Sequence, residues 1–295
     1  MHIKSLIRKQ STAAYIFLLP SMIVLLLFVL GPLSFSFFSS FFDFNIMMTK
    51  FKFIGFLNYA NVLHDERFWN SLLNVTYFTL AIVPAQTVIS LLLAMAVNKQ
   101  SRLNVLYRTI YYLPVVCSMT IVGLAFNMIL NYNIGIVPEF IRSLGFTPID
   151  VFHDPVWAMP AIILISIYKG FGFTMVILLA ALQGVPDSYY EAAQMDGANK
   201  VDMFFRITLP SIAPSLTFVV ITTVIGSFQV FDQVYVITKG GPLYKTETAV
   251  QYIYERAFVT NEMGFAIANA VLLFAVILLF TLVNYQISRR SEENF

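Results

Sequence analysis

The chain has 295 residues, of which 58% are hydrophobic and only 12% are charged. A soluble domain carries about 25% charged residues, so this composition indicates a membrane protein. A net charge of +2 without a long basic run does not favour a nucleic-acid partner, and a single cysteine excludes a disulfide within the chain.

Long stretches with little or no charge recur along the chain. A bilayer core of about 30 Å needs roughly 20 apolar residues in a helix, and each stretch reaches that length. Helices are expected rather than strands, because in lipid every backbone amide must find its partner within the segment. We therefore predict an all-α membrane protein with six transmembrane helices. The stretches are residues 10–42, 68–98, 109–138, 155–186, 207–231 and 263–288, and only Lys169 interrupts the fourth.

The first stretch follows a basic segment and could be interpreted as a signal peptide. Its apolar core, residues 13–33, is longer than the roughly 7–15 residues of a signal sequence, so we expect a membrane anchor. Six spans place both termini on one side, and the segments on that side carry the larger share of Lys and Arg, which indicates the cytoplasm. The predicted parts are cytoplasmic segments 1–12 and 289–295, a first helix and its exit in 13–42, an outer loop in 43–70 and a five-helix core in 71–288.

The predicted inner loop, residues 183–210, carries helix signals of its own between two apolar runs. Ser188 and Glu191 have the spacing of a capping box at a helix start, and Gly197 is a typical helix stop. A second helical segment is expected over residues 199–208. A helix resting on lipid headgroups is the less favoured alternative, because such helices are rich in Lys and Arg and the first helix has neither. We expect a partner on the aqueous side to hold this loop.

Several motifs resemble those of one transporter family. The inner loop resembles the EAA loop of permease subunits in binding-protein-dependent ABC importers, and two outer segments resemble sugar permeases of the maltose type. The resemblance covers nearly the whole chain from Leu19 onward and implies a type I importer permease core with a cytoplasmic coupling helix. The extra N-terminal spans and outer domain of one maltose permease are not matched. The motifs are Glu191-Ala192-Ala193, Asp196-Gly197-Ala198, Ile207-Thr208-Leu209-Pro210, Gly55-Phe56-Leu57-Asn58-Tyr59 and Thr238-Lys239-Gly240-Gly241-Pro242.

The resemblance implies a permease subunit that forms half of the pathway for a carbohydrate in a bacterial or archaeal cytoplasmic (inner) membrane. The implied partners are a second, related permease, two cytoplasmic ATPase subunits and an extracytoplasmic solute-binding protein that docks near Gly240-Gly241-Pro242. The sequence contains no phosphate-loop motif, so we expect a transport subunit rather than an enzyme, with ATP and Mg on the ATPase and no cofactor on this chain. The residues implied to contact the ATPase are Tyr189, Tyr190, Glu191, Ala192, Ala193, Asp196 and Gly197.

A sugar pathway requires polar and aromatic side chains within the spans, because sugars present hydroxyls and apolar ring faces. Helix–helix hydrogen bonding is the alternative role and is favoured for any single Ser or Thr. Lys169 is unusual, because a lone charge at mid-span costs about 2.5–3.5 kcal/mol. We expect it at the pathway or a subunit interface, unless Gly170-Phe171-Gly172 breaks the helix there. The candidate pathway residues are Asn127, Asn131, Gly135, Tyr168, Lys169, Thr223, Ser227 and Gln229, of which Asn131, Gly135, Thr223 and Ser227 also rest on the resemblance.

Two other functions remain open from the sequence. One is an ABC permease for a different solute, which only the ligand of the binding protein would distinguish. The other is a secondary transporter or channel that needs no ATPase. It is less favoured, because the sequence has no repeated hydropathy half, no carbonyl-filter motif and no regularly spaced intramembrane arginines.

Overall fold

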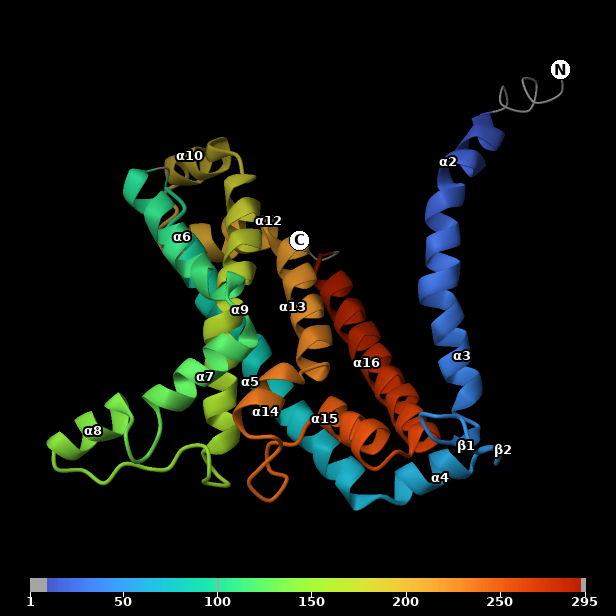
Figure 1. The fold of residues 1–295 in the computed structure, drawn as a ribbon. Coiled ribbons are helices and arrows are strands. Elements are labelled where there is room, and N and C mark those ends of the chain that lie inside the picture. Colours follow the sequence, from blue (N-terminus) through green and yellow to red (C-terminus); the bar gives the residue numbers. More distant parts are fainter. Residues whose placement is uncertain (1–9, 100, 293–295) are drawn as a thin grey trace. The chain divides into compact units, whose positions relative to one another are not determined.

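The computed structural model describes residues 10–99 and 101–292, and the side chains of residues 14–99 and 101–286. Within these ranges the chain is mainly helical, with one two-stranded hairpin (Figure 1). It divides into two compact units, residues 1–64 with 253–272, and residues 65–252 with 273–295. Most of the two predicted cytoplasmic segments, including Lys4, Arg8 and Lys9, lies outside the described residues or side chains.

The first unit begins with a long helix that contains a π-helical turn, formed by α2 (Gln10–Leu25), η1 (Leu26–Leu30) and α3 (Gly31–Ser39). Pro32 explains the turn, because it has no backbone N–H and its ring crowds the carbonyl four residues earlier. The N–H of Gly31 donates to the carbonyl of Leu26, five residues back. Every side chain of residues 14–35 is exposed, and residues 14–39 are long and apolar enough to cross a membrane.

A hairpin and a short helix follow in the first unit. β1 (Phe42–Phe44) pairs antiparallel with β2 (Phe51–Phe53), and α4 (Leu57–His64) comes next. Asn58 is buried and its amide donates to the carbonyls of Ser40 and Phe42 at 2.8 and 3.0 Å. Gly264, at the start of α16 (Met263–Glu292), approaches so closely that a Cβ there would lie 2.0 Å from the Phe42 carbonyl oxygen. The predicted outer loop therefore contains strands, which the all-α expectation missed.

The second unit is built around two long helices, α5 (Glu66–Ala96) and α9 (Ala158–Gln183), which run side by side (Figure 1). α6 (Arg102–Val116) packs against α9, and α13 (Ala213–Phe228) packs against α5 and α9. The hydrophobic core lies where the ends of these helices meet. Its buried side chains are Ala94, Val97, Met175, Leu178, Leu179, Leu182, Ile212 and Val219.

Two glycines of α9 permit close helix packing. A Cβ at Gly172 would lie 2.3 Å from the Tyr111 carbonyl oxygen of α6, and one at Gly170 would lie 2.5 Å from Oε1 of Gln86 on α5. α9 continues through both glycines, so the alternative of a helix break at Gly170-Phe171-Gly172 is excluded. At these positions the lack of a side chain lets α5 and α6 come close to α9, and α9 does not end there.

Two of the six predicted spans are broken helices. α6 and α7 (Met119–Ile129) meet at 96°, and the helices of residues 200–211 meet α13 at 67°. At the first break Cys117 is extended, with ψ 142°, and Ser118 starts the new helix by accepting a hydrogen bond from the N–H of Ile121 at 3.3 Å. The predicted third span is thus not one continuous helix, and the apolar run past α7 instead forms a turn and α8 (Ile136–Ser143).

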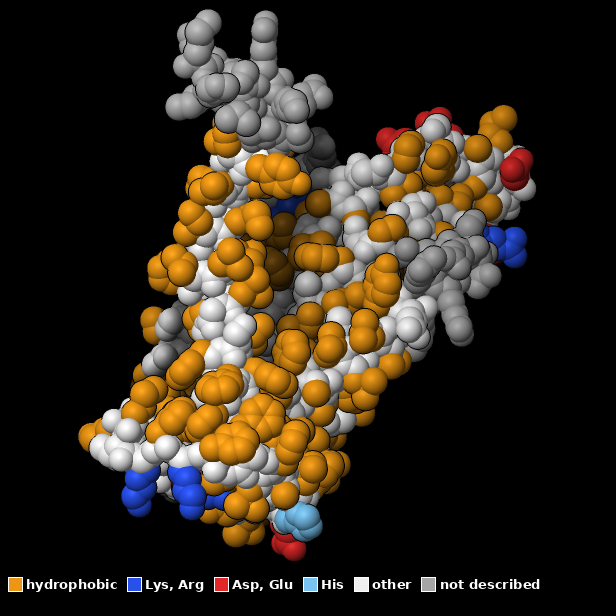
Figure 2. Space-filling model, turned by 90° about the vertical axis from the view of Figure 1, so that its right-hand side faces the viewer, with side chains coloured by type: hydrophobic (Ala, Val, Ile, Leu, Met, Phe, Trp, Pro, Cys, Tyr) orange, Lys and Arg blue, Asp and Glu red, His pale blue; other side chains and the backbone are white. Residues whose placement is uncertain are grey.

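Within residues 10–99 and 101–292, four helices are individually long and apolar enough to cross a membrane, and the count rises to six if each bent pair is one span. Figure 2 shows hydrophobic side chains over most of the face that it draws, as expected for helices that contact lipid.

Candidate functional site

The loop after α9 contains α10 (Asp187–Met195), which covers most of the predicted coupling helix (Figure 1). The predicted capping box of Ser188 and Glu191 is wrong. Pro186 occupies the N-cap position without a side-chain hydrogen bond, so Ser188 already lies inside the first helical turn. The structure instead forms a capping box one helix later, where Asn199 and Asp202 start α11 (Lys200–Met203).

Gly197 ends α10 as predicted, in the left-handed conformation with φ +83°. The N–H of Ala198 donates to the carbonyl of Ala193 at 2.9 Å, and the N–H of Gly197 donates to that of Gln194 at 3.1 Å. These two bonds form a Schellman motif, which satisfies carbonyls at the helix end. A side chain at position 197 would be strained by the positive φ alone, since a Cβ there would meet no atom within 4 Å.

The side chains of α10 are mostly exposed. Glu191, Ala192, Asp196 and Gly197 are exposed, Tyr189 is 56% exposed, and Tyr190 and Ala193 are half-buried. The Tyr190 hydroxyl lies 3.1 Å from Oγ1 of buried Thr208, which in turn donates to the Met203 carbonyl at 3.3 Å.

These contacts connect α10 to the segment that leads into α13. That segment is η2 (Phe204–Thr208) and α12 (Leu209–Ser211), where Pro210 follows a π-helical turn as Pro32 does in the first unit.

A cavity of about 370 Å³ lies between α5, α9 and α13, with contributions from α6 and α14 (Asp232–Ile237). The polar side chains that line it are amides, hydroxyls and one charged group, the ammonium group of Lys169. Gln86 donates to Oγ1 of Thr174 at 2.9 Å, and Ser227 donates to Oγ1 of Thr79 at 2.9 Å. The polar lining residues are Gln86, Ser166, Lys169, Thr174, Thr222, Thr223, Ser227 and Gln233.

Lys169 lies on the cavity wall where α9 passes the break between α6 and α7. Its Nζ donates to the carbonyl oxygen of Val115 at 3.2 Å and lies 3.5 Å from that of Pro114. α6 ends at Val116, so these carbonyls have no partner within their own helix. Lys169 forms no ion pair with any residue for which side chains are described, and Asp232 is exposed and outside the cavity lining.

The structure brings three of the eight predicted pathway residues together at the cavity, namely Lys169, Thr223 and Ser227. The other five lie elsewhere in the second unit. Asn127 donates to the Ile237 carbonyl at 3.4 Å, and Asn131 and Gly135 belong to the turn before α8. Tyr168 contacts the rings of Phe126 and Phe171, and Gln229 is exposed at the end of α13.

Sequence reasoning missed several cavity residues, of which Gln86 and Gln233 are the clearest. Gln86 lies within a predicted span, and a polar amide there is the same kind of signal that marked Asn127. Gln233 follows the fifth apolar stretch, and the kink between α13 and α14 is what brings it to the cavity.

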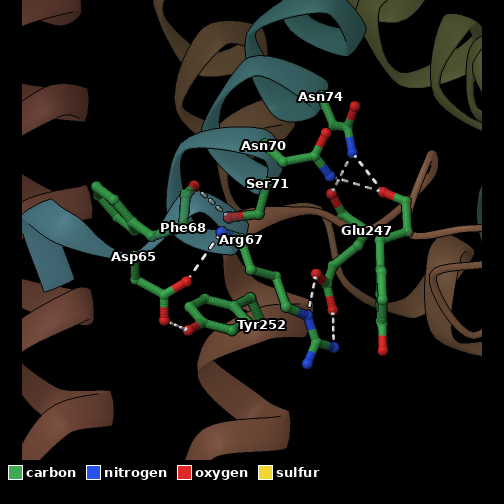
Figure 3. A network of polar contacts seen from close by, with 9 residues as sticks. Asp65, Arg67, Phe68, Asn70, Ser71, Asn74, Glu247 and Tyr252 are labelled. Carbon is green, nitrogen blue, oxygen red and sulfur yellow. Dashed lines mark hydrogen bonds and ion pairs between the residues drawn. The ribbon is translucent and has the colours of Figure 1, made fainter.

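A second polar site joins the start of α5 to the segment before α15 (Ala249–Tyr254) (Figure 3). Glu247 is 1% exposed, and Arg67 binds both its carboxylate oxygens, with Nε at 2.8 Å and Nη2 at 2.6 Å. The guanidinium also lies 4.0 Å from the ring centre of Tyr244. Asn70 and Asn74 donate to the Tyr244 carbonyl at 3.0 and 2.8 Å.

The same network holds the Gly-Gly-Pro segment. Asn74 also donates to the Glu247 carbonyl at 2.9 Å, and the neighbouring Thr246 donates to the Gly241 carbonyl at 2.6 Å. Tyr252 donates to Asp65, whose other oxygen accepts from the N–H of Arg67 at 2.8 Å. The segment is therefore fixed to a long helix by several exposed and partly buried hydrogen bonds.

Comparison with known proteins assigns the class. Residues 60–293 match the family described as binding-protein-dependent transport system inner membrane component, and the chain belongs to this family. It is 34% identical over 280 residues to the sulfoquinovosyl glycerol transport system permease protein SmoG of Agrobacterium fabrum, covering 95% of this chain and 91% of that one. It is 29% identical to the trehalose/maltose transport system permease protein MalF of Thermococcus litoralis, covering 95% of each.

A solved structure has the same fold. A chain of the bacterial alginate ABC transporter, crystallised with an alginate pentasaccharide-bound periplasmic protein, superposes with a TM-score of 0.83 at 25% identity over 96% of each chain. The predicted class, an ABC importer permease of the carbohydrate branch, is confirmed. The family consists of inner membrane transport components, so the prediction of a transport subunit rather than an enzyme is confirmed as well.

Proposed function

We propose that this chain forms half of the translocation pathway of an ATP-driven importer for a carbohydrate. The observation that carries the proposal is the cavity between α5, α9 and α13, because its amides and hydroxyls can bond sugar hydroxyls and its volume is in the range of small-molecule sites, about 300–1,000 Å³. A relative named as a trehalose/maltose permease and the related alginate transporter favour the same class of solute. A second, related permease would complete the pathway.

The proposed topology has six spans, of which the third and the fifth are the broken helices, and both termini in the cytoplasm. It places α10 on the cytoplasmic side of the inner membrane and the segment Gly240-Gly241-Pro242 on the outer side. The solute-binding protein would dock at that outer side. The rigid attachment of the segment to α5 through Asn74 and Glu247 supports a docking role.

α10 is the proposed coupling helix, held in a cleft of one of two ATPase subunits. The small exposed side chain of Ala192 beside Glu191 would let the surface of a partner approach closely. Since Tyr190 contacts Thr208 in the segment that leads into α13, a rigid movement of α10 would displace a helix that lines the cavity. ATP and Mg would stay on the ATPase. The proposed ATPase contacts are Tyr189, Tyr190, Glu191, Ala192, Ala193, Asp196 and Gly197.

Reconstitution tests the proposal. The chain is purified with the proteins that co-elute with it and placed in vesicles with its loaded binding protein. We expect a second permease and an ATPase to co-elute, and ATP-dependent accumulation of a saccharide. Accumulation of a solute by vesicles that contain this chain alone would overturn the proposal, and a binding protein loaded with a non-sugar solute would overturn the carbohydrate part only.

A further inference from the structure

The cavity contains a single charged side chain, and that charge is positive. We propose that the cavity binds the negatively charged group of an acidic saccharide, with Lys169 as its counter-charge. The inference rests on the proposed transport function and adds the class of cargo, a sugar that carries a carboxylate or sulfonate group.

Lys169 lies at a place where the helix geometry favours a positive charge. The Pro114 and Val115 carbonyls that it contacts are at the C-terminal end of α6, where the helix dipole presents its negative pole. Carbonyl dipoles stabilise a cation without neutralising it. The break between α6 and α7 therefore creates a place for a positive charge within an apolar bundle.

No residue of the described cavity wall supplies a compensating negative charge. The lining contains two amides, five hydroxyls and apolar side chains, and no Asp or Glu. An ammonium group has three N–H donors, and the two carbonyls use two of them at most. Lys169 is half-buried on the cavity wall and can direct the remaining donor to the cavity.

A neutral sugar would not need this arrangement. The hydroxyls and amides of Ser166, Thr223 and Gln233 can bond sugar hydroxyls on their own. A lone cation in a low-dielectric site costs free energy, and this cost falls when an anion enters. An acidic sugar matches both parts of the wall, its charged group at Lys169 and its hydroxyls at the uncharged residues.

The test uses the complete importer in vesicles, with the binding protein, and saccharides matched in length that are either neutral or carry uronate groups. We expect uptake of the acidic saccharide. Lys169→Gln should lower it about tenfold, because a charge-assisted hydrogen bond is lost, whereas Lys169→Arg should retain most of it. The affinity of the binding protein for the saccharide is measured alongside, since it must not change.

Thr87→Val is the matched control, because Thr87 lies on α5 but outside the cavity lining. The Thr87 hydroxyl donates to the Val83 carbonyl of its own helix at 2.7 Å, so its loss should lower acidic uptake by much less than tenfold. The same experiment would also reveal whether Lys169 acts only as a cap at the end of α6. In that case Lys169→Gln would lower thermal stability and substrate-free ATPase activity in proportion to uptake, and the proposal would be overturned.

The possible failures are distinguishable. Uptake of neutral saccharides only would overturn the acidic cargo and leave the carbohydrate importer standing, whereas uptake of no saccharide would overturn both. The Lys169→Gln defect must persist in vesicles of phosphatidylcholine alone. Its disappearance there would assign the cavity to an anionic lipid headgroup and would contradict the proposal.

Discussion

The regions next to the two ends of α5 are held in place in different ways. At the start of the helix, Arg67 forms an ion pair with buried Glu247, 180 positions away in the sequence. Near its other end, α10 is held by hydrogen bonds between close neighbours, such as Ala198 to Ala193, and leaves most side chains exposed. The ion pair links distant parts of the chain and so makes the region at the start of α5 rigid. The local hydrogen bonds of α10 leave its side chains accessible to another protein. Substitutions at the two ends should therefore separate loss of stability from loss of function.

The largest expected effect on stability is at this ion pair. Arg67→Met removes the cation that binds both carboxylate oxygens of buried Glu247, which should destabilise the protein by about 3–5 kcal/mol. The measurement is thermal or denaturant unfolding of the purified importer in detergent. The control is Arg206→Met, which breaks the exposed pair with Asp202 and should cost about 0–1 kcal/mol.

A double variant sharpens this prediction. If the cost of Arg67→Met comes from the uncompensated carboxylate, then Arg67→Met with Glu247→Leu should regain most of the lost stability. A double variant no more stable than the single one would instead assign the cost to the loss of the guanidinium stacking on Tyr244 and the local packing.

The second prediction concerns the contact between α6 and α9, in the middle of the second unit. Gly172→Ala places a Cβ 2.3 Å from the Tyr111 carbonyl oxygen of α6, so the helices must separate. We expect a loss of about 1–3 kcal/mol by overpacking, measured in the same unfolding experiment. Gly226→Ala is the matched control, because a Cβ at Gly226 meets no atom within 4 Å. Equal stability of the two variants would contradict the close approach of α6 and α9.

This contrast also explains what the sequence could reveal. The helix stop at Gly197 and the positions of the apolar helices follow from local signals, and these were predicted. The break at Cys117 was not, because the apolar run continues through it and a single N-cap residue, Ser118, is a weak signal within such a run. The carbonyl partners of Lys169 depend on that break and lie 54 or more residues away. Arg67 and Glu247 each resemble an ordinary charged residue outside the spans, since only the folded chain brings them together.

A smaller effect is expected at the hydrogen bond that connects α10 to the segment before α13. Tyr190→Phe removes the hydroxyl that lies 3.1 Å from Thr208 Oγ1, which should cost about 1 kcal/mol. Substrate-stimulated ATPase activity should fall more than stability does, because the contact is a proposed route from α10 to the cavity wall. Tyr189→Phe is the control, since its side chain is 56% exposed and forms no such bond in the described part of the chain. Identical ATPase activity in both variants would remove Tyr190 from the route.

The smallest effect on stability is expected where the proposed effect on function is greatest. Glu191 is exposed on α10, so Glu191→Lys should change the free energy of unfolding by less than about 0.5 kcal/mol. The same substitution reverses a charge in the proposed ATPase contact, and we expect membrane insertion to persist while substrate-stimulated ATPase activity and uptake are lost.

Asp187→Lys is the control, because it makes the same charge reversal at the start of α10, outside the proposed contact residues. If Glu191→Lys retained normal stimulated ATPase activity, or if Asp187→Lys abolished it equally, the assignment of the contact to Glu191 would be wrong. The exposed surface of α10 and the network at Arg67 and Glu247 would then differ in packing, but the separate function assigned to α10 would lose its support.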